Sequence, residues 1–410
     1  MNRYKLVLGG LVTLFALSGV LYQAWLKERG WIGGLLCRYV VCEDEAAVEA
    51  AHQRLWSGEL DGAVEWFRAA LRRDAASPYR WCDLGEALLE AGRGEESRQY
   101  FLRAVELGGH SPPVLMRAAN FHFRMGEGSR ALPYTARVLA MLGDYDGIVF
   151  SSYSRMGISV EEALKQGLPE EKRAAQAFFR YVLGRGSLEE AGRVWQWMGE
   201  RSLEDLRLAD EYAGFLVGAR QYERAAREWA AHGGSCGKGY PEPNHVFNGS
   251  FECEPAGQTL DWRITPVAGA AAGRDGSVAS AGRWSLRIDF EGRENLAYRH
   301  VAQRAFVKPG AYRFEAQVRA SGITTDQGVG FRIVDAEDSR WLEVTTERVA
   351  GTTDWRKVEK RFTVGKQTGL VEVQVVREPS LKFDNKIGGT VWIDGVKLGG
   401  NWVIESLRDW

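Results

Sequence analysis

The sequence predicts a multidomain protein with an N-terminal transmembrane helix, an all-α solenoid of helical repeats and an all-β sandwich. Three observations lead to this fold class. They are an uncharged apolar stretch near the N-terminus, a repeat with a period of about 34 residues, and an alternation of apolar and polar residues in the C-terminal part. We expect a membrane anchor at 1–30, repeats at 46–231, a linker at 232–243, the sandwich at 244–400 and a tail at 401–410.

The composition is that of a globular protein without a nucleic-acid partner. Apolar residues make up 45% of the 410-residue chain, which is long enough for about two or three domains. The formal net charge is −1, so the chain lacks the basic excess that nucleic-acid binding requires. The sequence therefore predicts no nucleic-acid partner.

The stretch Leu6–Leu26 carries no charge and follows Arg3 and Lys5. It is long enough to cross a hydrocarbon core of about 30 Å as a helix. A cleaved signal peptide is the alternative, but the apolar core of such a peptide is normally shorter, and no convincing cleavage site follows here. We therefore expect an uncleaved single-pass anchor in the inner (cytoplasmic) membrane, with the large domain in the periplasm or outside the cell.

The helical region repeats itself at one fixed interval. Gly58, Gly92 and Gly126 are evenly spaced along the chain and define this interval. The same interval separates Phe67 from Phe101, Ala70 from Ala104, Pro78 from Pro112, and the small residues Ala63, Ser97 and Ala131. We expect the glycine to end the first helix of each unit in a left-handed conformation, and the proline to stop the second helix.

A second group of residues, Trp81, Leu84, Gly85 and Leu88, forms a W-x-x-L-G pattern on the first helix of the second unit. Together with the interval, these residues resemble tetratricopeptide repeat proteins. The resemblance implies an all-α tetratricopeptide solenoid whose concave surface binds a protein partner.

The interval returns at Gly184 and Gly218, and also in the pairs Ala191 and Ala225, Trp195 and Trp229. The separation between Gly126 and Gly184 is longer than one interval and shorter than two, so the later repeats are out of step with the earlier ones. We therefore expect about five units, interrupted by an irregular or inserted segment around residues 145–169.

The linker contains four glycines and two prolines between Gly233 and Pro243, which break the helical pattern. The chain has five cysteines, and we expect Cys82 to be buried on a repeat helix. If the soluble part is exported, the candidate disulfides are Cys236 with Cys253 and Cys37 with Cys42. Free thiols are the alternative, because pairing does not follow from sequence.

Apolar and polar residues alternate in six segments after the linker, and turn residues separate these segments. The segments are Trp284–Phe290, Tyr312–Ala320, Gly328–Asp335, Trp355–Val364, Leu370–Glu378 and Thr390–Gly399. This period of two predicts an antiparallel β-sandwich of about eight or nine strands.

The motif FNGSFE at Phe247–Glu252, followed by Trp262 and closed by VWIDGVKL at Val391–Leu398, resembles jelly-roll carbohydrate-binding modules. The resemblance implies a polysaccharide ligand and a jelly-roll sandwich. It also implies that Glu252 and Asp394 help to hold a structural calcium ion, the one cofactor we consider. Solvated carboxylates at the strand ends are the alternative.

A sugar-binding surface needs flat aromatic faces with polar groups at the rim. We expect Trp262, Tyr298 and Trp341 to supply the faces, with packing in the core as the alternative for each. The hydrogen-bonding candidates are Arg299, Arg332 and Glu343. The resemblance places three further tryptophans in the core: Trp284, Trp355 and Trp392.

The histidines show no zinc-binding spacing, and no carboxylate pair stands out as catalytic. The sequence therefore predicts a membrane-anchored, exported adaptor rather than an enzyme. It would bind a protein through its repeats and a glycan through its sandwich, for example in cell-envelope or exopolysaccharide assembly. The alternatives are a structural scaffold that binds no sugar and an enzyme that acts on polysaccharide through an unrecognised carboxylate pair.

Overall fold

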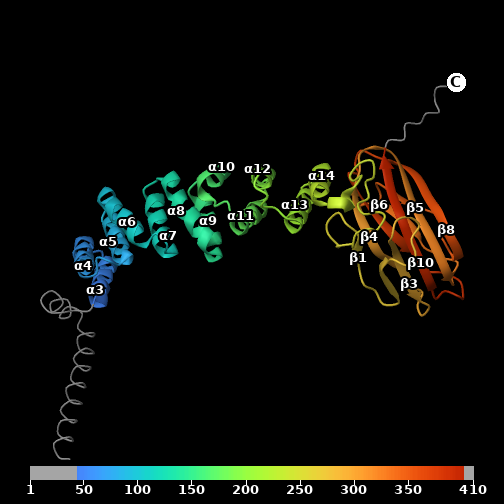
Figure 1. Ribbon diagram of the computed structural model, residues 1–410, viewed down its shortest axis with the longest axis horizontal. Helices are drawn as coiled ribbons and strands as arrows, with labels where there is room; N and C mark the ends of the chain where they lie inside the picture. Colours follow the sequence, from blue (N-terminus) through green and yellow to red (C-terminus); the bar gives the residue numbers. More distant parts are fainter. Residues whose placement is uncertain (1–43, 401–410) are drawn as a thin grey trace, which may run out of the picture. The chain divides into compact units, whose positions relative to one another are not determined.

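The computed structural model describes residues 44–400 (Figure 1). These residues form helices in the N-terminal part and a β-sandwich of two antiparallel sheets in the C-terminal part. They divide into two compact units, one ending at Leu203 and the other beginning at Glu204. The predicted anchor, the cysteine pair Cys37 and Cys42, and the tail at 401–410 lie outside the described residues.

The prediction of a single-pass inner-membrane protein is not upheld. Within residues 44–400, no helix combines the length and the apolar composition that crossing a membrane requires.

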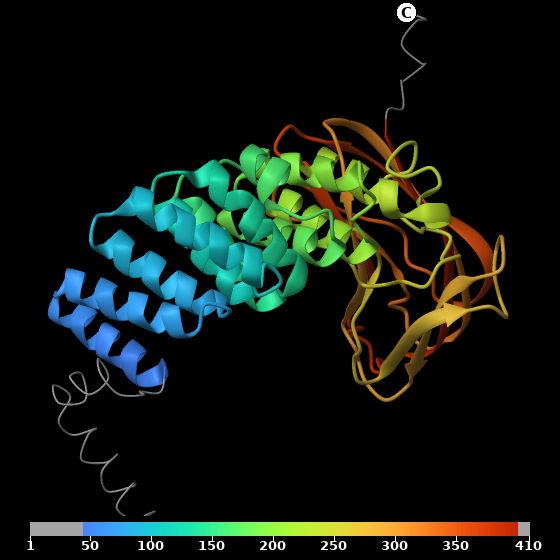
Figure 2. The same cartoon turned by 60° about the vertical axis from the view of Figure 1, so that its left-hand side comes forward.

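Twelve helices named α are found in the described residues. Ten belong to the first unit: α3 (Asp44–Ser57), α4 (Leu60–Arg73), α5 (Pro78–Glu90), α6 (Gly94–Gly108), α7 (Pro112–Arg124), α8 (Gly128–Met141), α9 (Asp146–Arg155), α10 (Val160–Glu162), α11 (Lys172–Arg185) and α12 (Leu188–Gly199). The second unit begins with α13 (Leu206–Gly218) and α14 (Tyr222–His232). Figure 2 shows α3 to α8 as successive hairpins stacked side by side.

The first three glycines of the repeat end helices in a left-handed conformation, as the sequence predicts. Gly58, Gly92 and Gly126 follow the helices α3, α5 and α7 with φ angles of 82°, 74° and 73°. Residues with side chains rarely adopt such angles, so glycine ends these helices without strain. The prolines behave differently from the prediction: Pro78 and Pro112 stand in the first turns of α5 and α7, where the missing N–H costs nothing.

The packing between helices explains the small residues of the repeat. Gly85 on α5 faces Phe101 on α6, and a Cβ at position 85 would lie 2.8 Å from the phenyl ring. Ser97, on the same helix as Phe101, is buried and donates a 2.7 Å hydrogen bond to the Gly85 carbonyl. A larger side chain at position 85 would therefore separate the two helices.

In the later repeats the left-handed position differs from the prediction. Gly184 lies inside α11 and Gly218 is the last residue of α13, whereas the positive φ angles occur two positions further on, at Gly186 (79°) and Arg220 (57°). The repeat interval is preserved between Gly186 and Arg220. The irregular segment before them contains the short elements η1 (Gly143–Tyr145), α9, α10 and η2 (Ala163–Gly167).

Ten strands are present in the described residues, whereas the sequence predicted eight or nine. Two strands at the edges of one sheet, β1 and β7, are too short to show an alternating pattern in the sequence. One sheet has the order β1-β4-β9-β6-β7, and the other has the order β2-β3-β10-β5-β8. The strands are β1 (Arg263–Ile264), β2 (Ala270–Asp275), β3 (Ser285–Glu291), β4 (Tyr298–Phe306), β5 (Gly310–Ile323), β6 (Gly330–Asp335), β7 (Glu343–Thr345), β8 (Gly351–Val364), β9 (Leu370–Arg377) and β10 (Gly388–Gly400).

The boundary between the units lies earlier than the predicted linker, because α13 and α14 pack on the sandwich. Trp229 of α14 contacts Phe247 edge to face, with ring centroids 5.6 Å apart. On α13, Asp210 accepts a 2.7 Å hydrogen bond from the amide of Thr259. The intervening segment is held as well, since Cys236 and Cys253 form one of the two candidate disulfides.

The remaining cysteine of the described residues is Cys82 on α5. It is a buried free thiol, as expected from the sequence. Burial raises its pKa to about 12, so the thiol stays protonated and unreactive at neutral pH.

Candidate functional site

The outer face of the sheet β1-β4-β9-β6-β7 is polar, although the strands at its centre are rich in valine. In β9, Val371, Val373 and Val375 point into the core between the sheets. Side chains alternate along a strand, so Glu372 and Gln374 project from the opposite, outer face. The same alternation in β6 buries Phe331 and Ile333 and leaves Arg332 on the outer face.

Five side chains on this face form one continuous row of hydrogen bonds, which we call the polar row. Arg263 of β1 donates to Glu372 (2.8 Å), and Gln374 also donates to Glu372 (2.6 Å). Arg332 of β6 donates to Gln374 (3.0 Å) and to Glu343 of β7 (2.8 Å). The row thus links β1, β9, β6 and β7, and its members hold one another in place.

The row is balanced in charge. Its two arginines, Arg263 and Arg332, each pair with a carboxylate, Glu372 and Glu343 respectively. The hydrogen bond and charge of Arg332 lower the pKa of Glu343, which therefore stays ionised at neutral pH. Such a surface offers donors and acceptors to a polar ligand without a strong net field.

The structure brings several of the predicted residues to this sheet. Arg332 and Glu343 are both in the polar row, and Arg299 of β4 forms its own 2.9 Å ion pair with Glu378. Trp341 lies two residues before Glu343, in the loop between β6 and β7, and is 43% exposed. Of the three aromatic candidates, Trp262, Tyr298 and Trp341, only Trp341 has a side chain with substantial solvent exposure.

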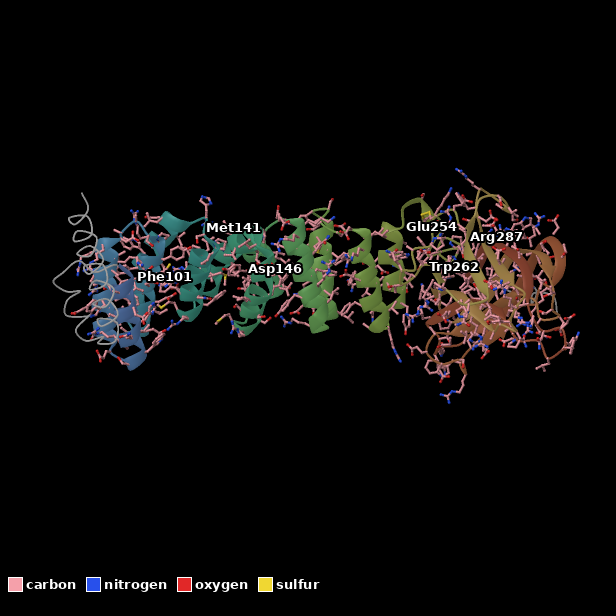
Figure 3. The ribbon with its side chains drawn as sticks, turned by 90° about the horizontal axis from the view of Figure 1, so that it is seen from below. Phe101, Met141, Asp146, Glu254, Trp262 and Arg287 are labelled. Carbon is pink, nitrogen blue, oxygen red and sulfur yellow. A yellow bond between two sulfur atoms is a disulfide. The ribbon has the colours of Figure 1, made fainter. Side chains whose placement is uncertain are left out.

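Trp262 and Tyr298 were predicted to face a sugar, and the structure corrects both predictions. Trp262, labelled in the sandwich in Figure 3, is completely buried. It packs near Phe251 and donates a 3.3 Å hydrogen bond to the carbonyl of Asn248. Tyr298 is 1% exposed and packs edge to face on Phe290. Both are core residues, because the backbone at each position turns the side chain inward.

The resemblance placed three other tryptophans in the core, but the structure leaves each of them only partly buried: Trp284, Trp355 and Trp392. Trp392 lies on the outer face of the other sheet, and the guanidinium groups of Arg287 and Arg319 each lie 5.7 Å from its ring centre. Its indole N–H donates to Asp275 (2.8 Å). These partners come from other strands of the same sheet, so the cluster fastens that surface together.

Glu252 and Asp394, the candidate calcium ligands, face the same loop. Asp394 accepts 2.9 Å hydrogen bonds from the amides of Ser280 and Ala281, and Glu252 accepts from the amides of Arg283 (2.8 Å) and Trp284 (3.1 Å). Burial raises the pKa of Asp394, and the nearby charge of Glu252 acts in the same direction.

This donor set does not fit a calcium ion. Calcium takes about six to eight oxygen ligands, whereas the loop turns amide hydrogens toward the two carboxylates. Within residues 44–400 no group of three or more His, Cys, Asp or Glu side chains is arranged to hold a metal.

Sequence reasoning missed three members of the polar row: Arg263, Glu372 and Gln374. A signal for the last two was present, because they are the polar residues at alternate positions of an otherwise apolar strand. Arg263 gave no such signal, since β1 has only two residues.

Residues 243–380 match a family model described as a carbohydrate binding domain. The matched residues include β1 to β9 and the whole polar row. The C-terminal sandwich is therefore a domain of the carbohydrate-binding-module type. None of the curated proteins matches this chain.

Three solved structures illustrate what the chain resembles. TmCBM61, in complex with β-1,4-galactotriose, is 18% identical with a TM-score of 0.28, and the match covers 38% of this chain and 99% of that chain. The CBM22-1 xylan-binding domain of Xyn10C from Paenibacillus barcinonensis is 13% identical with a TM-score of 0.26, and the match covers 37% of this chain and 90% of that chain. MamA is 18% identical with a TM-score of 0.27, and the match covers 38% of this chain and 91% of that chain. Likenesses at this level do not assign a ligand or a partner.

Proposed function

We propose that the sandwich binds a polysaccharide across its polar row, and that the helical region binds a protein, so that the chain acts as an adaptor between the two. The observation that carries the proposal is the position of the row. It is a pre-organised set of donors and acceptors, and it lies within the residues that match the carbohydrate binding domain family.

The geometry of the row suits an extended glycan. Neighbouring strands lie about 4.8 Å apart, which is close to the advance per sugar in an extended β-1,4-linked chain. A polysaccharide that crosses the three neighbouring strands β9, β6 and β7 would meet side chains of the polar row on each of them. Trp341, beside the Glu343 end of the row, offers an apolar surface for the C–H face of a sugar ring.

Binding without cleavage agrees with the electrostatics. A glycosidase needs one carboxyl group whose pKa is raised so that it can act as a general acid. Arg332 shifts the pKa of Glu343 in the opposite direction. Glu343 is therefore unsuited to act as the general acid of a polysaccharide-cleaving enzyme.

The assignment of the helices to the tetratricopeptide class is part of the proposal. It is supported by the recurrence of glycine with positive φ at the ends of α3, α5 and α7 and by the Gly85–Phe101 packing. Repeated helical hairpins present extended surfaces that bind proteins. We expect a protein partner for this region and no nucleic acid.

The test is calorimetric titration of the full chain with soluble neutral and acidic polysaccharides, including xylan, β-glucan, galactan and polygalacturonate. Gln374→Ala and Arg332→Ala should each weaken binding about tenfold, because each leaves paired polar groups without a partner. The matched control is Gln317→Ala, since Gln317 is a half-buried glutamine on β5 of the other sheet. Equal losses in the control and in Gln374→Ala would rule out the polar row as the site.

A second candidate is a protein-interaction module that binds no sugar. Leu381 and Phe383, in the loop between β9 and β10, are fully exposed, and exposed apolar side chains often mark protein contacts. This candidate predicts no binding to any polysaccharide in the titration, with the sandwich folded.

A further inference from the structure

Helix α14 makes specific contacts with one loop of the sandwich. The loop spans residues 336–342, between β6 and β7, and we call it the Trp341 loop. The Tyr222 hydroxyl, in the first turn of α14, donates a hydrogen bond to Glu337 in this loop. Arg220, just before the helix, donates to the other carboxylate oxygen at 2.7 Å. Glu337 is thus held by two groups at one end of α14.

The ring of Tyr222 also fixes the start of β9. A Cβ at Gly369 would lie 2.7 Å from the Tyr222 ring, so the ring approaches this backbone as closely as glycine permits. The Gly369 carbonyl accepts the amide of Val307 (3.1 Å). The carbonyl of the next residue, Leu370, accepts the amide of Ala336, the first residue of the Trp341 loop (3.0 Å).

The loop is fixed from the other side by Asp335, which is buried at the end of β6. One oxygen of Asp335 accepts the amides of Glu337 (2.7 Å) and Asp338 (2.9 Å). The carbonyl of Asp338 then accepts the amide of Trp341 (3.0 Å). A short chain of hydrogen bonds therefore runs from Tyr222 through Glu337, Asp335 and Asp338 to Trp341.

We infer that Tyr222 and Arg220 are positioning residues for glycan binding: through Glu337 they hold the Trp341 loop in the conformation that places Trp341 beside the polar row. This inference rests on the proposed function of the sandwich. Its physical basis is pre-organisation, since a loop already held in its bound conformation loses less conformational entropy when the ligand arrives. The last helical pair would then be a part of the sugar-binding unit.

The chemistry of the contact makes it stable over a wide pH range. Burial and the neighbouring Glu337 carboxylate raise the pKa of Tyr222 to about 12. The phenol therefore keeps its proton, and remains the donor to Glu337, at every pH at which the protein would normally be studied.

The test uses the full chain with Tyr222→Phe, Glu337→Gln and the double variant. The matched control is Lys308→Gln, which removes another ion pair between α14 and the sandwich, the 2.9 Å contact of Lys308 with Glu223, in which no residue of the Trp341 loop takes part. Two quantities are measured: the Kd for the polysaccharide that the wild type binds best, and the ¹⁹F resonance of Trp341 in protein labelled with 5-fluorotryptophan. Trp341→Phe assigns that resonance by its disappearance.

We expect each single variant to weaken binding about threefold to tenfold, the range that one lost hydrogen bond produces. We expect the Trp341 resonance to shift in both, and the double variant to lose little more than either single one. Lys308→Gln should change neither quantity. If the wild type binds and the variants keep both its Kd and its Trp341 resonance, the positioning role is wrong while the proposed function stands. If the wild type binds no polysaccharide, the proposed function fails, and this inference with it.

Discussion

Glu252 and Asp394 lie far apart in the sequence and accept amide hydrogens from a single loop, Ser280–Trp284. Glu252 follows the first turns of the sandwich, and Asp394 lies in β10, its last described strand. The loop between β2 and β3 is thereby fastened to both ends of the domain. Hydrogen bonds from backbone amides to an ionised carboxylate are charge-assisted and roughly twice as strong as neutral ones. Of the two carboxylates, Asp394 is the buried one.

Replacing Asp394 should therefore destabilise the sandwich. Asp394→Ala leaves the amides of Ser280, Ala281 and Gly395 without an acceptor, and each buried unpaired group costs about 1–3 kcal/mol. We expect a loss of about 3 kcal/mol in the free energy of unfolding, measured by urea denaturation. Asp384→Ala, at an exposed position of the β9–β10 loop, serves as the control and should change it little.

The pH dependence gives a second test of Asp394. Burial raises its pKa above the ordinary value of 3.8, so the folded state holds a proton that the unfolded state has released. Between these two pKa values, the contribution of Asp394 to the free energy of unfolding falls as the pH rises. Denaturation at several acidic pH values should show this slope in the wild type and a weaker one in Asp394→Asn. Identical slopes would refute the assignment.

Calcium should not stabilise the protein. The carboxylates of Glu252 and Asp394 already have amide partners, and a ligand raises stability only when it binds the folded state. The midpoint of thermal unfolding is expected to be the same in calcium and in a chelator. A midpoint that rises with calcium concentration would restore the calcium site that the family resemblance implied.

Two tryptophans should respond in opposite ways to replacement by alanine. Trp262→Ala removes a fully buried ring and should cost about 3–5 kcal/mol of unfolding free energy. Trp341→Ala removes a 43% exposed ring, so its stability should change by less than about 1 kcal/mol while the affinity for polysaccharide falls at least threefold. Urea denaturation and calorimetric titration on both variants separate a core role from a binding role.

The glycines of the repeat should also divide into two groups. Gly92 has a φ of 74°, so Gly92→Ala should destabilise the helical unit by about 1 kcal/mol. Gly184 lies within α11 with no atom near its missing Cβ, so Gly184→Ala should stabilise it by about 0.5–1 kcal/mol. Destabilisation by both replacements would mean that the left-handed position of the later repeat is Gly184 after all.

The sequence by itself determined the kinds of structure and their order. The repeat interval depends on local requirements, a glycine where a helix ends and a small residue where two helices touch, and these are visible along the chain. Alternation likewise revealed the sandwich. Arg332 and Glu343, two members of the polar row, had been named as hydrogen-bonding candidates. The pairing of Cys236 with Cys253 was among the candidates.

Only the tertiary structure decided which side chains face water and which partners they meet. Trp262 and Trp341 look alike in the sequence, but one fills the space between the sheets and the other lies in a loop. The pairing of α13 and α14 with the sandwich, and the amides that approach Glu252 and Asp394, arise between residues far apart along the chain. Such contacts depend on how elements pack together, and a local pattern contains no information about the opposite wall of a core.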